Sequence, residues 1–582
     1  MKWNLLASSP ASSDTLAREL GVSPIVAQLL INRGICDAKS AQTFLKPDLN
    51  NLSDPMSLPG VKTALERIDK ALKHKEKILI YGDYDTDGVT ATALLISMFK
   101  FIDVTVEHHL PNRLEEGYGL NKTAIKKIAD NGAKLLITVD CGITDIESVA
   151  YAKELGLDII VTDHHEPVRD ENNTIILPDA VAIINPKIIP GHPMELSGVG
   201  VAFKLAWAFS QQFTNSKKQS PEFQAFLTEA IALVVIGTIT DVSELSGENR
   251  ILTAYGMPLL KNISVAWLDA LIEKSRIKKE KLMPEDISFR IGPRLNASGR
   301  LGNAQASLEL LLCKSKRRAL EMADELEKNN QSRQRIEKKI IESVREKIAK
   351  KINIKKDYAI VLGDESWHIG VLGIVASKIA DEFNRPTILF SIKGASAKGS
   401  ARSIQAFHLY EGLQHCHNLL IKYGGHSYAA GIEIETDNIE IFKDSLNEYA
   451  HSKLAKADLE PALDIDTEVL LNQLNYNSVK QIEQLMPFGE GNPEPVLISR
   501  NVEIAGTPSL VGANDEHCSF VVKQAGGQTN CAHRVIAFNL AKKWDEFTKV
   551  IQNPFQIAYM PKIDTWSYQP SIVLHLRDFK PL

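Results

Sequence analysis

The stretch that decides the fold is K-I-L-I-Y-G-D-Y-D-T-D-G at residues 77–88, where a short apolar run ends in a glycine and three aspartates. Residues 78–80 have a charged residue before them and Gly82 soon after them, a pattern typical of a buried parallel strand followed by a turn. The apolar residues 89–101 then predict a helix that packs back on the sheet, and Gly88 allows the chain a tight start to that helix. The acidic side chains therefore lie where a strand ends.

Three further acidic or histidine motifs follow apolar segments in the same way. They are T-V-D-C-G at residues 138–142, T-D-H-H at 162–165 and G-T-I-T-D at 237–241. Additional strands are predicted at residues 104–106, 135–139, 159–161 and 181–184, with helices between most of them, for example at 121–131 and 146–155.

Strands that alternate with helices predict an open α/β parallel sheet, in which ligands bind beyond the carboxyl ends of the strands. We therefore expect five side chains from distant parts of the chain to converge: Asp85, Asp87, Asp140, His164 and His165. Asp241 follows residues 230–239, whose apolar pattern fits either a strand or a buried helix.

Carboxylate and imidazole ligands in this proportion favour Mn²⁺ or Mg²⁺ over Zn²⁺. Two such ions about 3.5–4 Å apart can activate a water and stabilise both oxygens of an in-line displacement at phosphorus. Taken together, the motifs predict a two-metal phosphoryl hydrolase. A single aspartate after a strand is more often a turn residue or a helix cap. The pair His108–His109 lies in an alternating segment and is interpreted as structural, and Cys141 lacks an evident partner base, which favours a packing role.

The composition is that of a globular, multidomain protein. The chain has 582 residues, 44% of them hydrophobic, and no uninterrupted apolar run of about 18 residues, so no membrane span is expected. The apolar part of the N-terminus is too short for a convincing signal peptide, and six scattered cysteines without a C-x-x-C favour a reducing cytoplasm. The net charge of −5 neither indicates nor excludes nucleic-acid binding, because the distribution of charge matters more than its total.

The second half of the chain has three patterns. Residues 314–353 are rich in lysine and arginine and predict a long connecting helix, with either a basic face towards DNA or ordinary solvated pairs four residues apart. Residues 354–454 predict a second α/β domain whose first strand is 358–362. Strands at 502–504, 519–522, 535–538, 556–559 and 572–576 then predict a five-stranded barrel of OB type.

Aromatic residues of this barrel are candidates for stacking on unpaired bases. The five candidates are Phe520, Phe538, Tyr559, Trp566 and Tyr568. A core position is favoured for Phe520 and Phe538, whereas Trp566 and Tyr568 flank a polar loop and are the better candidates for base stacking.

With these residues in view, the chain resembles the DHH phosphoesterase superfamily, whose signature is Asp163–His164–His165, and within it the bacterial single-strand-specific DNA exonucleases. The resemblance rests on L-P-N-R-L-E-E-G-Y-G-L (110–120), G-P-R-L-N-A-S-G-R-L (292–301), W-H-I-G-V-L-G-I-V-A-S-K (367–378), Y-G-G-H-S-Y-A-A-G (423–431) and M-P-F-G-E-G-N-P-E-P (486–495). It implies an N-terminal helical segment (1–57), a catalytic DHH domain (58–313), the connecting helix (314–353), a DHHA1 domain (354–460) and an OB-type nucleic-acid-binding domain (461–582).

The resemblance also implies roles for individual residues. The metal ligands would be Asp85, Asp87, Asp140, His164, His165 and Asp241, with Asp83 as a direct ligand or a neighbour of one. One departure is Tyr81, where the pyrophosphatase branch has a histidine, so one ion could be held by fewer protein ligands.

Other residues would hold the nucleic acid. His426 would contact the scissile phosphate or the leaving group, and Arg113, Ser400 and Arg402 would hold a 5′-terminal phosphate. Arg294, Asn296 and Arg300 would line the path of the strand. The backbone amides at Gly424 and Gly425 would approach an anionic ligand closely, the alternative being that these glycines only make a turn.

The activity implied by the resemblance is Mn²⁺- or Mg²⁺-dependent hydrolysis of single-stranded DNA to mononucleotides in the 5′-to-3′ direction, in DNA repair and recombination. A cytoplasmic monomer is expected, with a single-strand-binding protein and a RecQ-type helicase as partners. Two other readings are a DHH phosphodiesterase for small substrates such as short oligonucleotides, cyclic dinucleotides or pyrophosphate, and an inactive DHH scaffold that only binds DNA. The long chain, the added barrel and the basic helix argue against the small-substrate enzyme, and the presence of every expected acidic and histidine ligand argues against the scaffold.

Overall fold

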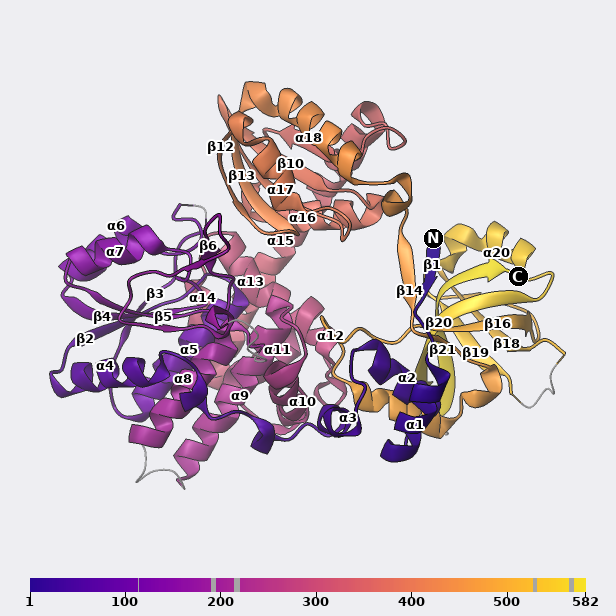
Figure 1. Cartoon of the computed structure of the whole chain (residues 1–582), viewed down its shortest axis with the longest axis horizontal. Coiled ribbons are helices and arrows are strands. Elements are labelled where there is room, and N and C mark those ends of the chain that lie inside the picture. Colours follow the sequence, from indigo (N-terminus) through magenta and orange to yellow (C-terminus); the bar gives the residue numbers. More distant parts are fainter. Residues whose placement is uncertain (114, 190–194, 214–219, 527–530, 565–569) are drawn as a thin grey trace. The chain divides into compact units, whose positions relative to one another are not determined.

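The computed structural model describes residues 1–113, 115–189, 195–213, 220–526, 531–564 and 570–582, and the chain divides into two compact units (Figure 1). The larger unit contains residues 53–243 and 247–460. The smaller unit contains residues 1–52, 244–246 and 461–582, and is therefore built from both ends of the chain. The acidic and histidine motifs all lie in the larger unit.

A five-stranded, wholly parallel sheet forms the first part of the larger unit, in the order β3-β2-β4-β5-β8. Its strands are β2 (Lys77–Tyr81), β3 (Glu107–His109), β4 (Ala133–Val139), β5 (Asp158–Thr162) and β8 (Ala182–Ile184). The chain passes from β2 to β3 on one side and then to β4 on the other, so the winding reverses between β2 and β4. Such a switch point is where an open α/β sheet binds its ligands.

The expected parallel sheet is confirmed, with one error of position. The strand predicted at residues 104–106 instead covers Glu107–His109, because only these residues pair with the end of β2, from Leu79 to Tyr81. The structural interpretation of His108–His109 agrees with their contacts. His108 Nε2 lies 3.0 Å from Gln305 Oε1, and His109 Nε2 lies 3.0 Å from Glu116 Oε2.

Helices cover both faces of this sheet (Figure 1). Apolar side chains of α6 (Lys122–Asp130) and α7 (Ile146–Glu154) form one core with β2, β4 and β5. The other face carries α4 (Val61–Lys73), α5 (Thr86–Phe101) and α8 (Gly198–Phe213), and α9 (Pro221–Asp241) packs on α5 and α8. The unit continues through α10 (Gly247–Asn262), α11 (Ala266–Lys274), α12 (Pro284–Asp286), α13 (Gly292–Arg300) and α14 (Gln305–Leu312), while β6 (Val168–Arg169) and β7 (Ile175–Ile176) pair separately.

Helix α9 contains the segment whose type the sequence left open. Residues 230–239 are helical and almost wholly buried, which explains an apolar run without helical periodicity. By length and composition alone α9 could cross a membrane, and 61% of its most apolar window is buried within the protein. Packing of α9 against α5, α8 and α10 accounts for this composition as that of a core helix.

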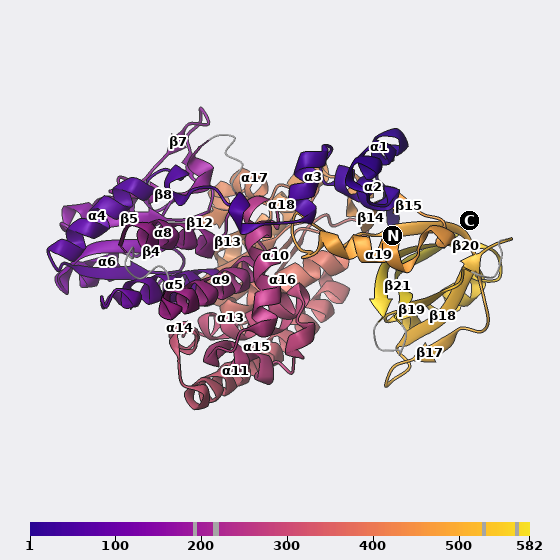
Figure 2. The same ribbon diagram turned by 90° about the horizontal axis from the view of Figure 1, so that it is seen from below.

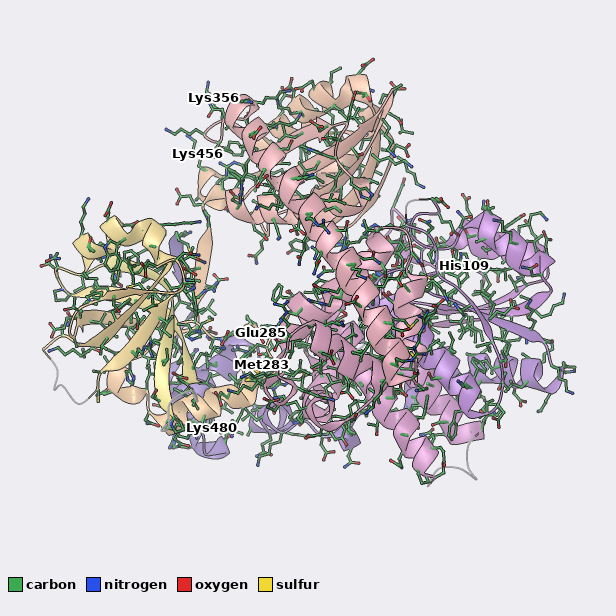
Figure 3. All side chains as sticks on the ribbon, turned by 180° about the vertical axis from the view of Figure 1, so that it is seen from behind. His109, Met283, Glu285, Lys356, Lys456 and Lys480 are labelled. Carbon is green, nitrogen blue, oxygen red and sulfur yellow. The ribbon has the colours of Figure 1, made fainter. Side chains whose placement is uncertain are left out.

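The long helix α15 (Lys316–Lys351) leads into a second sheet of order β12-β13-β11-β10-β9 (Figure 3, where Lys356 marks the chain just after the helix). The strands are β9 (Ile360–Asp364), β10 (Thr387–Lys393), β11 (Ser396–Arg402), β12 (Leu420–Gly425) and β13 (Ala429–Glu435). The helices are α16 (Ile369–Phe383), α17 (Leu409–His415) and α18 (Ile439–Lys453). Strands β9 and β10 are parallel, and the other neighbours are antiparallel.

The charges of α15 are largely paired. Pairs within the helix join Arg317 to Glu321, Lys328 to Asp324 and Arg333 to Glu337. Glu327 pairs with Arg294 of α13, and Arg345 with Glu382 of α16. These pairs favour the interpretation of α15 as a solvated, ion-paired helix over that of a dedicated basic face.

The smaller unit contains a closed barrel. Its sheet has the order β15-β16-β20-β21-β19-β18-β17, and an additional pairing between β16 and β18 closes five strands into a ring, as the sequence predicts. The strands are β15 (Thr467–Glu468), β16 (Leu497–Ile504), β17 (Ser509–Val511), β18 (His517–Gln524), β19 (His533–Ala537), β20 (Phe555–Asp564) and β21 (Ser571–Pro581). Two helices, α19 (Tyr476–Ile482) and α20 (Trp544–Val550), lie between strands in the chain.

The N-terminal segment belongs to the same unit. Strand β1 (Lys2–Leu5) pairs in parallel with β14 (Ala462–Ile465), and α1 (Pro10–Leu20), α2 (Pro24–Asn32) and α3 (Ala38–Leu45) follow. Apolar residues of α2 share one core with residues of the barrel, and Figure 2 shows α2 beside α19. The expectation of a largely helical and polar segment is therefore corrected: it also supplies a strand and part of an apolar core.

Candidate metal centre

Every predicted ligand lies at the switch point of the parallel sheet. The loop after β2 carries Asp83, Asp85 and Asp87, while Asp140 directly follows β4 and the signature histidines follow β5. The seventh carboxylate or imidazole position, Asp241, is the last residue of helix α9. Convergence at the carboxyl ends of the parallel strands thus joins residues from Asp83 to His165, and the end of helix α9 adds Asp241.

The ligand atoms are close enough to share cations. His164 Nε2 lies 3.2 Å from Asp140 Oδ1, 3.8 Å from Asp241 Oδ2 and 3.9 Å from Asp87 Oδ2. Three groups have ligand atoms within 4.8 Å of one another: Asp140 with His164 and His165; Asp87 with His164 and Asp241; and Asp83 with Asp85 and Asp140. Because Asp140 and His164 each belong to two groups, the cluster suits neighbouring ions that share ligands.

Polar atoms of the cluster have the properties of cation ligands. Asp83 Oδ1, Asp140 Oδ1 and His164 Nε2 are buried, and none of them forms a hydrogen bond of adequate geometry with another described residue. Burial and the neighbouring carboxylates raise the pKa values of Asp83, Asp85, Asp87 and Asp140. Buried acceptors without donors are costly, and a divalent cation relieves both the desolvation and the repulsion. The residues present therefore fit Mn²⁺ or Mg²⁺.

Asp163, the first residue of the signature, acts as a support for the ligands. Its Oδ1 lies 2.7 Å from His165 Nδ1 and accepts hydrogen bonds from the backbone amides of His164 and His165, while Oδ2 accepts from Ile143. Burial lowers the pKa of His165, but Asp163 outweighs it and raises that pKa to about 9. Because Asp163 engages Nδ1, the Nε2 lone pair is the one left for an ion.

Two glycines explain how the carboxylates come so close. Asp87 accepts hydrogen bonds from the backbone amides of Gly198, at 2.6 Å, and Val199, at 2.9 Å, at the start of α8. A Cβ on Gly198 would lie 2.5 Å from Asp140 Oδ1, and a Cβ on Gly88 would lie 2.6 Å from the backbone nitrogen of Asp83. Gly198 was missed in the sequence, although the glycine-rich S-G-V-G at residues 197–200 is a detectable signal for an anion-facing helix start.

Three neighbours of the cluster have structural roles. Tyr81 is fully buried and its hydroxyl donates to the Gly119 carbonyl at 3.1 Å, so it does not replace the histidine ligand of the pyrophosphatase branch. Burial raises the pKa of the Cys141 thiol, which agrees with the expected packing role. Asp85 also caps α5, since its Oδ1 accepts from the amides of Asp87 and Gly88, so a helix cap and a predicted ligand are the same residue.

Tyr118 is a second residue that the sequence reasoning missed. Its hydroxyl lies 3.1 Å from His165 Nδ1 and 3.4 Å from the Asp140 carbonyl, and 48% of the residue is exposed. It belongs to the motif at residues 110–120, in which the resemblance assigns a role only to Arg113. Tyr118 therefore presents an aromatic ring to solvent directly beside the histidine pair.

The predicted phosphate clamp forms a crowded group of guanidinium ions. Burial, followed by Arg113, Arg333 and Arg402, lowers the pKa of Arg300 to about 9, and burial and Arg113 lower the pKa of Arg402. Arg113 stacks over the Tyr84 ring at 5.1 Å, and Arg402 Nη1 lies 3.4 Å from Ser400 Oγ. Cations crowded in this way favour a bound anion, since an anion relieves their mutual repulsion.

The remaining strand-path residues are placed differently. Asn296 Oδ1 accepts from the backbone amide of Thr86 at 2.8 Å, next to the acidic loop. Arg294 instead pairs with Glu327 at 2.6 Å and joins α13 to α15, away from the cluster contacts. Burial and then the charges of Arg402 and His165 lower the pKa of His426, so this imidazole lies within electrostatic reach of both the guanidinium group and the metal ligands.

Gly424 and Gly425 are the last two residues of strand β12, directly before the hairpin that leads to β13. Gly425 has φ 147°, and a Cβ there would lie 2.3 Å from the Ala429 carbonyl oxygen. Gly424 has open space around it. Gly425 is therefore required by the hairpin, whereas Gly424 leaves the backbone accessible.

In the barrel, the aromatic predictions have mixed outcomes. Phe520 is buried as expected, and Tyr559 is fully buried with its hydroxyl 2.8 Å from Ser499 Oγ. The core prediction for Phe538 is wrong: β19 ends at Ala537, and Phe538 is 54% exposed. Its ring meets those of His517 and His575 edge-on at 5.2 and 5.4 Å. Trp566 and Tyr568 lie outside the described residues.

Fold, signature and ligand cluster together define a protein of the DHH phosphoesterase class. Residues 77–238 match the DHH family N-terminal domain, and residues 353–452 match the DHHA1 domain.

More specific similarity identifies the branch. Residues 465–578 match the RecJ OB domain. The chain is 36% identical to "Single-stranded-DNA-specific exonuclease RecJ" of Haemophilus influenzae, over 96% of both chains. It is also 36% identical to the Bacillus subtilis protein of that name, over 91% of this chain but 65% of that relative. The crystal structure of RecJ in complex with Mn²⁺ from Thermus thermophilus has 27% identity and a TM-score of 0.82, covering 100% of this chain and 80% of that one. The chain belongs to the RecJ family.

Proposed function

We propose that this chain is a Mn²⁺- or Mg²⁺-dependent exonuclease that hydrolyses single-stranded DNA from its 5′ end to mononucleotides, in DNA repair and recombination. The observation that carries the proposal is the buried cluster of carboxylates and imidazoles at the sheet switch point, with unpartnered ligand atoms, in the same compact unit as the arginine group. The names of its relatives support the same substrate.

Different residues of the chain have different roles in the proposed reaction. When bound, the divalent ions supply an activated water and neutralise charge on the phosphate. Asp163 and Gly198 hold His165 and Asp87 in place, so the ligands are pre-oriented. His426, which is neutral at pH 7 because its pKa is lowered, contacts the scissile phosphate or the leaving oxygen. Arg113, Arg402 and Ser400 receive the terminal phosphate and so set the end from which cleavage begins, and Arg300, within electrostatic range of both arginines, lines the path of the strand.

The test uses one oligonucleotide with an internal label and a 3′ label, incubated with purified protein and Mn²⁺ or Mg²⁺, beside a duplex control. Mononucleotides released from the 5′ side of the single strand, with the 3′ label lost last, are the expected result. Cleavage confined to very short oligomers would support the small-substrate phosphodiesterase instead. Binding without hydrolysis under either metal would support a scaffold.

Arg402→Ala is expected to reduce the preference for a 5′-phosphorylated end by about 10-fold or more, since a charge-assisted contact to phosphate contributes on the order of 1.5–3 kcal/mol. The measurement compares kcat/KM on 5′-phosphate and 5′-hydroxyl oligonucleotides of one sequence. The matched control is Arg345→Ala, because Arg345 lies on α15 and pairs with Glu382 of α16. An unchanged preference in the Arg402 variant would remove this residue from the clamp.

The barrel is proposed to hold the strand by base stacking, and Phe538 is its exposed candidate among the described residues. Phe538→Ala is expected to weaken binding of single-stranded DNA by about 10-fold, since each base stacked on an aromatic ring contributes about 1–3 kcal/mol. Fluorescence anisotropy of a labelled oligonucleotide in the absence of divalent metal measures it. Tyr476→Ala, which removes another exposed aromatic ring of the same unit, is the control; equal binding by the two variants would refute the role of Phe538.

For its surroundings, we propose a cytoplasmic monomer that receives single strands from a RecQ-type helicase and acts beside a single-strand-binding protein. Six free cysteines are compatible with a reducing compartment. Sedimentation of the purified chain and pull-down with the two partners test these points.

A further inference from the structure

Lys187 is a cation near the metal cluster to which neither the motifs nor the resemblance assigns a role. It lies in a short 3-10 helix, Pro186–Ile188, immediately after the last strand of the parallel sheet. This is the same carboxyl edge that carries the ligands. Its side chain is 31% exposed, so the ammonium is accessible.

A buried amide ties Lys187 to the metal-binding signature. Asn185 is fully buried; its Nδ2 donates to the backbone carbonyl of His165 at 3.0 Å, and its Oδ1 accepts from the backbone amide of Lys187 at 2.8 Å. One side chain therefore sets the backbone of a metal ligand and that of the lysine relative to each other.

Among the described residues, the Lys187 ammonium has one acidic partner, which is adjacent to the signature in sequence. Lys187 Nζ lies 3.3 Å from Oε1 of Glu166, the residue directly after His165. Glu166 is 68% exposed, and exposed ion pairs are weak and easily exchanged. A phosphate group offers the lysine a stronger partner than this solvated carboxylate.

The charge of Lys187 affects two imidazoles of the site, one after each of two different sheets' strands: His164 and His426. Burial is the main cause of the lowered pKa of His164, and the charge of Lys187 adds to it. Lys187 likewise adds to the lowering of the His426 pKa, after burial, Arg402 and His165. The ammonium thus lies within electrostatic range of His164 and of His426, the imidazole of the second sheet.

We propose that Lys187 binds a non-bridging phosphodiester oxygen of the substrate strand, and that Glu166 holds the ammonium in the DNA-free protein and releases it when DNA binds. This inference rests on the proposed function and adds a specific contact to it. It assigns the two residues opposite effects: the lysine strengthens productive binding, and the glutamate competes with the phosphate for it.

Lys187→Gln should lower kcat/KM on a 5′-phosphorylated single strand by about 10-fold at saturating Mn²⁺, the range expected for one charged hydrogen bond. The slope of log(kcat/KM) against log salt should become shallower by about 0.7, the value for one phosphate contact to a single strand. Lys187→Arg, which keeps the charge, should retain most of the wild-type activity. The control is Lys122→Gln, because Lys122 forms a similar exposed pair with Glu147 at 2.9 Å on the same domain.

Glu166→Gln should raise kcat/KM about 2- to 3-fold at low salt, because the lysine is freed, whereas Glu147→Gln should leave it unchanged. The gain should disappear in the double variant Lys187→Gln/Glu166→Gln, since its cause is the competition for Lys187. A gain of equal size in the Lys187→Gln background would show that Glu166 acts only through its own charge and would overturn the pairing.

The outcomes separate this inference from the proposed function. Wild-type protein that fails to degrade single strands contradicts the exonuclease itself. Active wild-type protein, with Lys187→Gln matching Lys122→Gln in both kcat/KM and salt slope, overturns the role of Lys187 alone.

Discussion

Replacing Asp140 with alanine is expected to lower the rate of single-strand hydrolysis by about three orders of magnitude or more, while affinity for single-stranded DNA changes by less than about 10-fold. Asp140 belongs to two of the three ligand groups described above, so its loss weakens both of the cation positions that these groups would form. The arginine group and the barrel do not use this carboxylate, which is why binding persists. Initial rates in Mn²⁺ and fluorescence anisotropy in its absence measure the two quantities.

The backbone at Asp140 calls for a companion variant. Asp140 has φ 61°, a left-handed conformation that asparagine adopts more readily than alanine. Asp140→Asn therefore keeps the local backbone and should be equally inactive. Asp130→Ala, which removes an exposed carboxylate paired with Lys126, is the control and should retain full activity. An Asp140 variant with activity close to that of the control would refute the metal assignment.

Asp163→Asn is expected to raise the Mn²⁺ concentration needed for half-maximal activity by about 10- to 100-fold, with activity partly restored at high metal. The carboxylate holds His165 by its Nδ1 and fixes three backbone amides, so its loss frees the orientation of a ligand without removing one. The measurement is the initial rate over a range of Mn²⁺ concentrations, because a rate at one concentration does not give the concentration needed for half-maximal activity.

The matched control for Asp163→Asn is Asp179→Asn, an exposed carboxylate that pairs with Lys153 in the same domain. Its metal requirement should equal that of the wild type. An Asp163 variant that is inactive at every Mn²⁺ concentration would mean that Asp163 is itself a ligand, and one with an unchanged requirement would mean that the hydrogen bond to His165 has no effect on binding.

Much of the catalytic unit can be predicted because local signals agree with one another. Short apolar runs that end in Asp85, Asp140 or His164 indicate both the strands and the edge at which ligands meet. The local signals do not agree for Asp241. The helix α9 that ends at Asp241 is apolar on all sides, so its sequence has no helical period that would distinguish it from a strand. The role of Gly198 was also missed, since close approach to Asp140 is a property of packing between distant segments.

Predictions about the barrel were less complete for a related reason. Alternating strands and turn residues specify the five strands, and their closure is a consequence of twist and pairing. The exposure of Phe538 depends on where β19 stops, and strand ends are the least certain part of a sequence-based prediction. The partnership of residues 1–52 with the barrel leaves no local signal, because its core contacts join opposite ends of the chain.

That partnership dictates an order of events during synthesis. Helix α2 carries apolar residues such as Val26, Leu29 and Leu30, whose core partners, among them Phe547 and Phe555, are translated hundreds of residues later. The catalytic unit is contiguous apart from three residues, so it can fold before the barrel residues that pack against the N-terminal helices have been translated. These helices are thus translated before the catalytic unit but meet their core partners only after it, and a ribosome that stalls within the barrel strands would release a chain with a folded catalytic unit and exposed, aggregation-prone apolar helices.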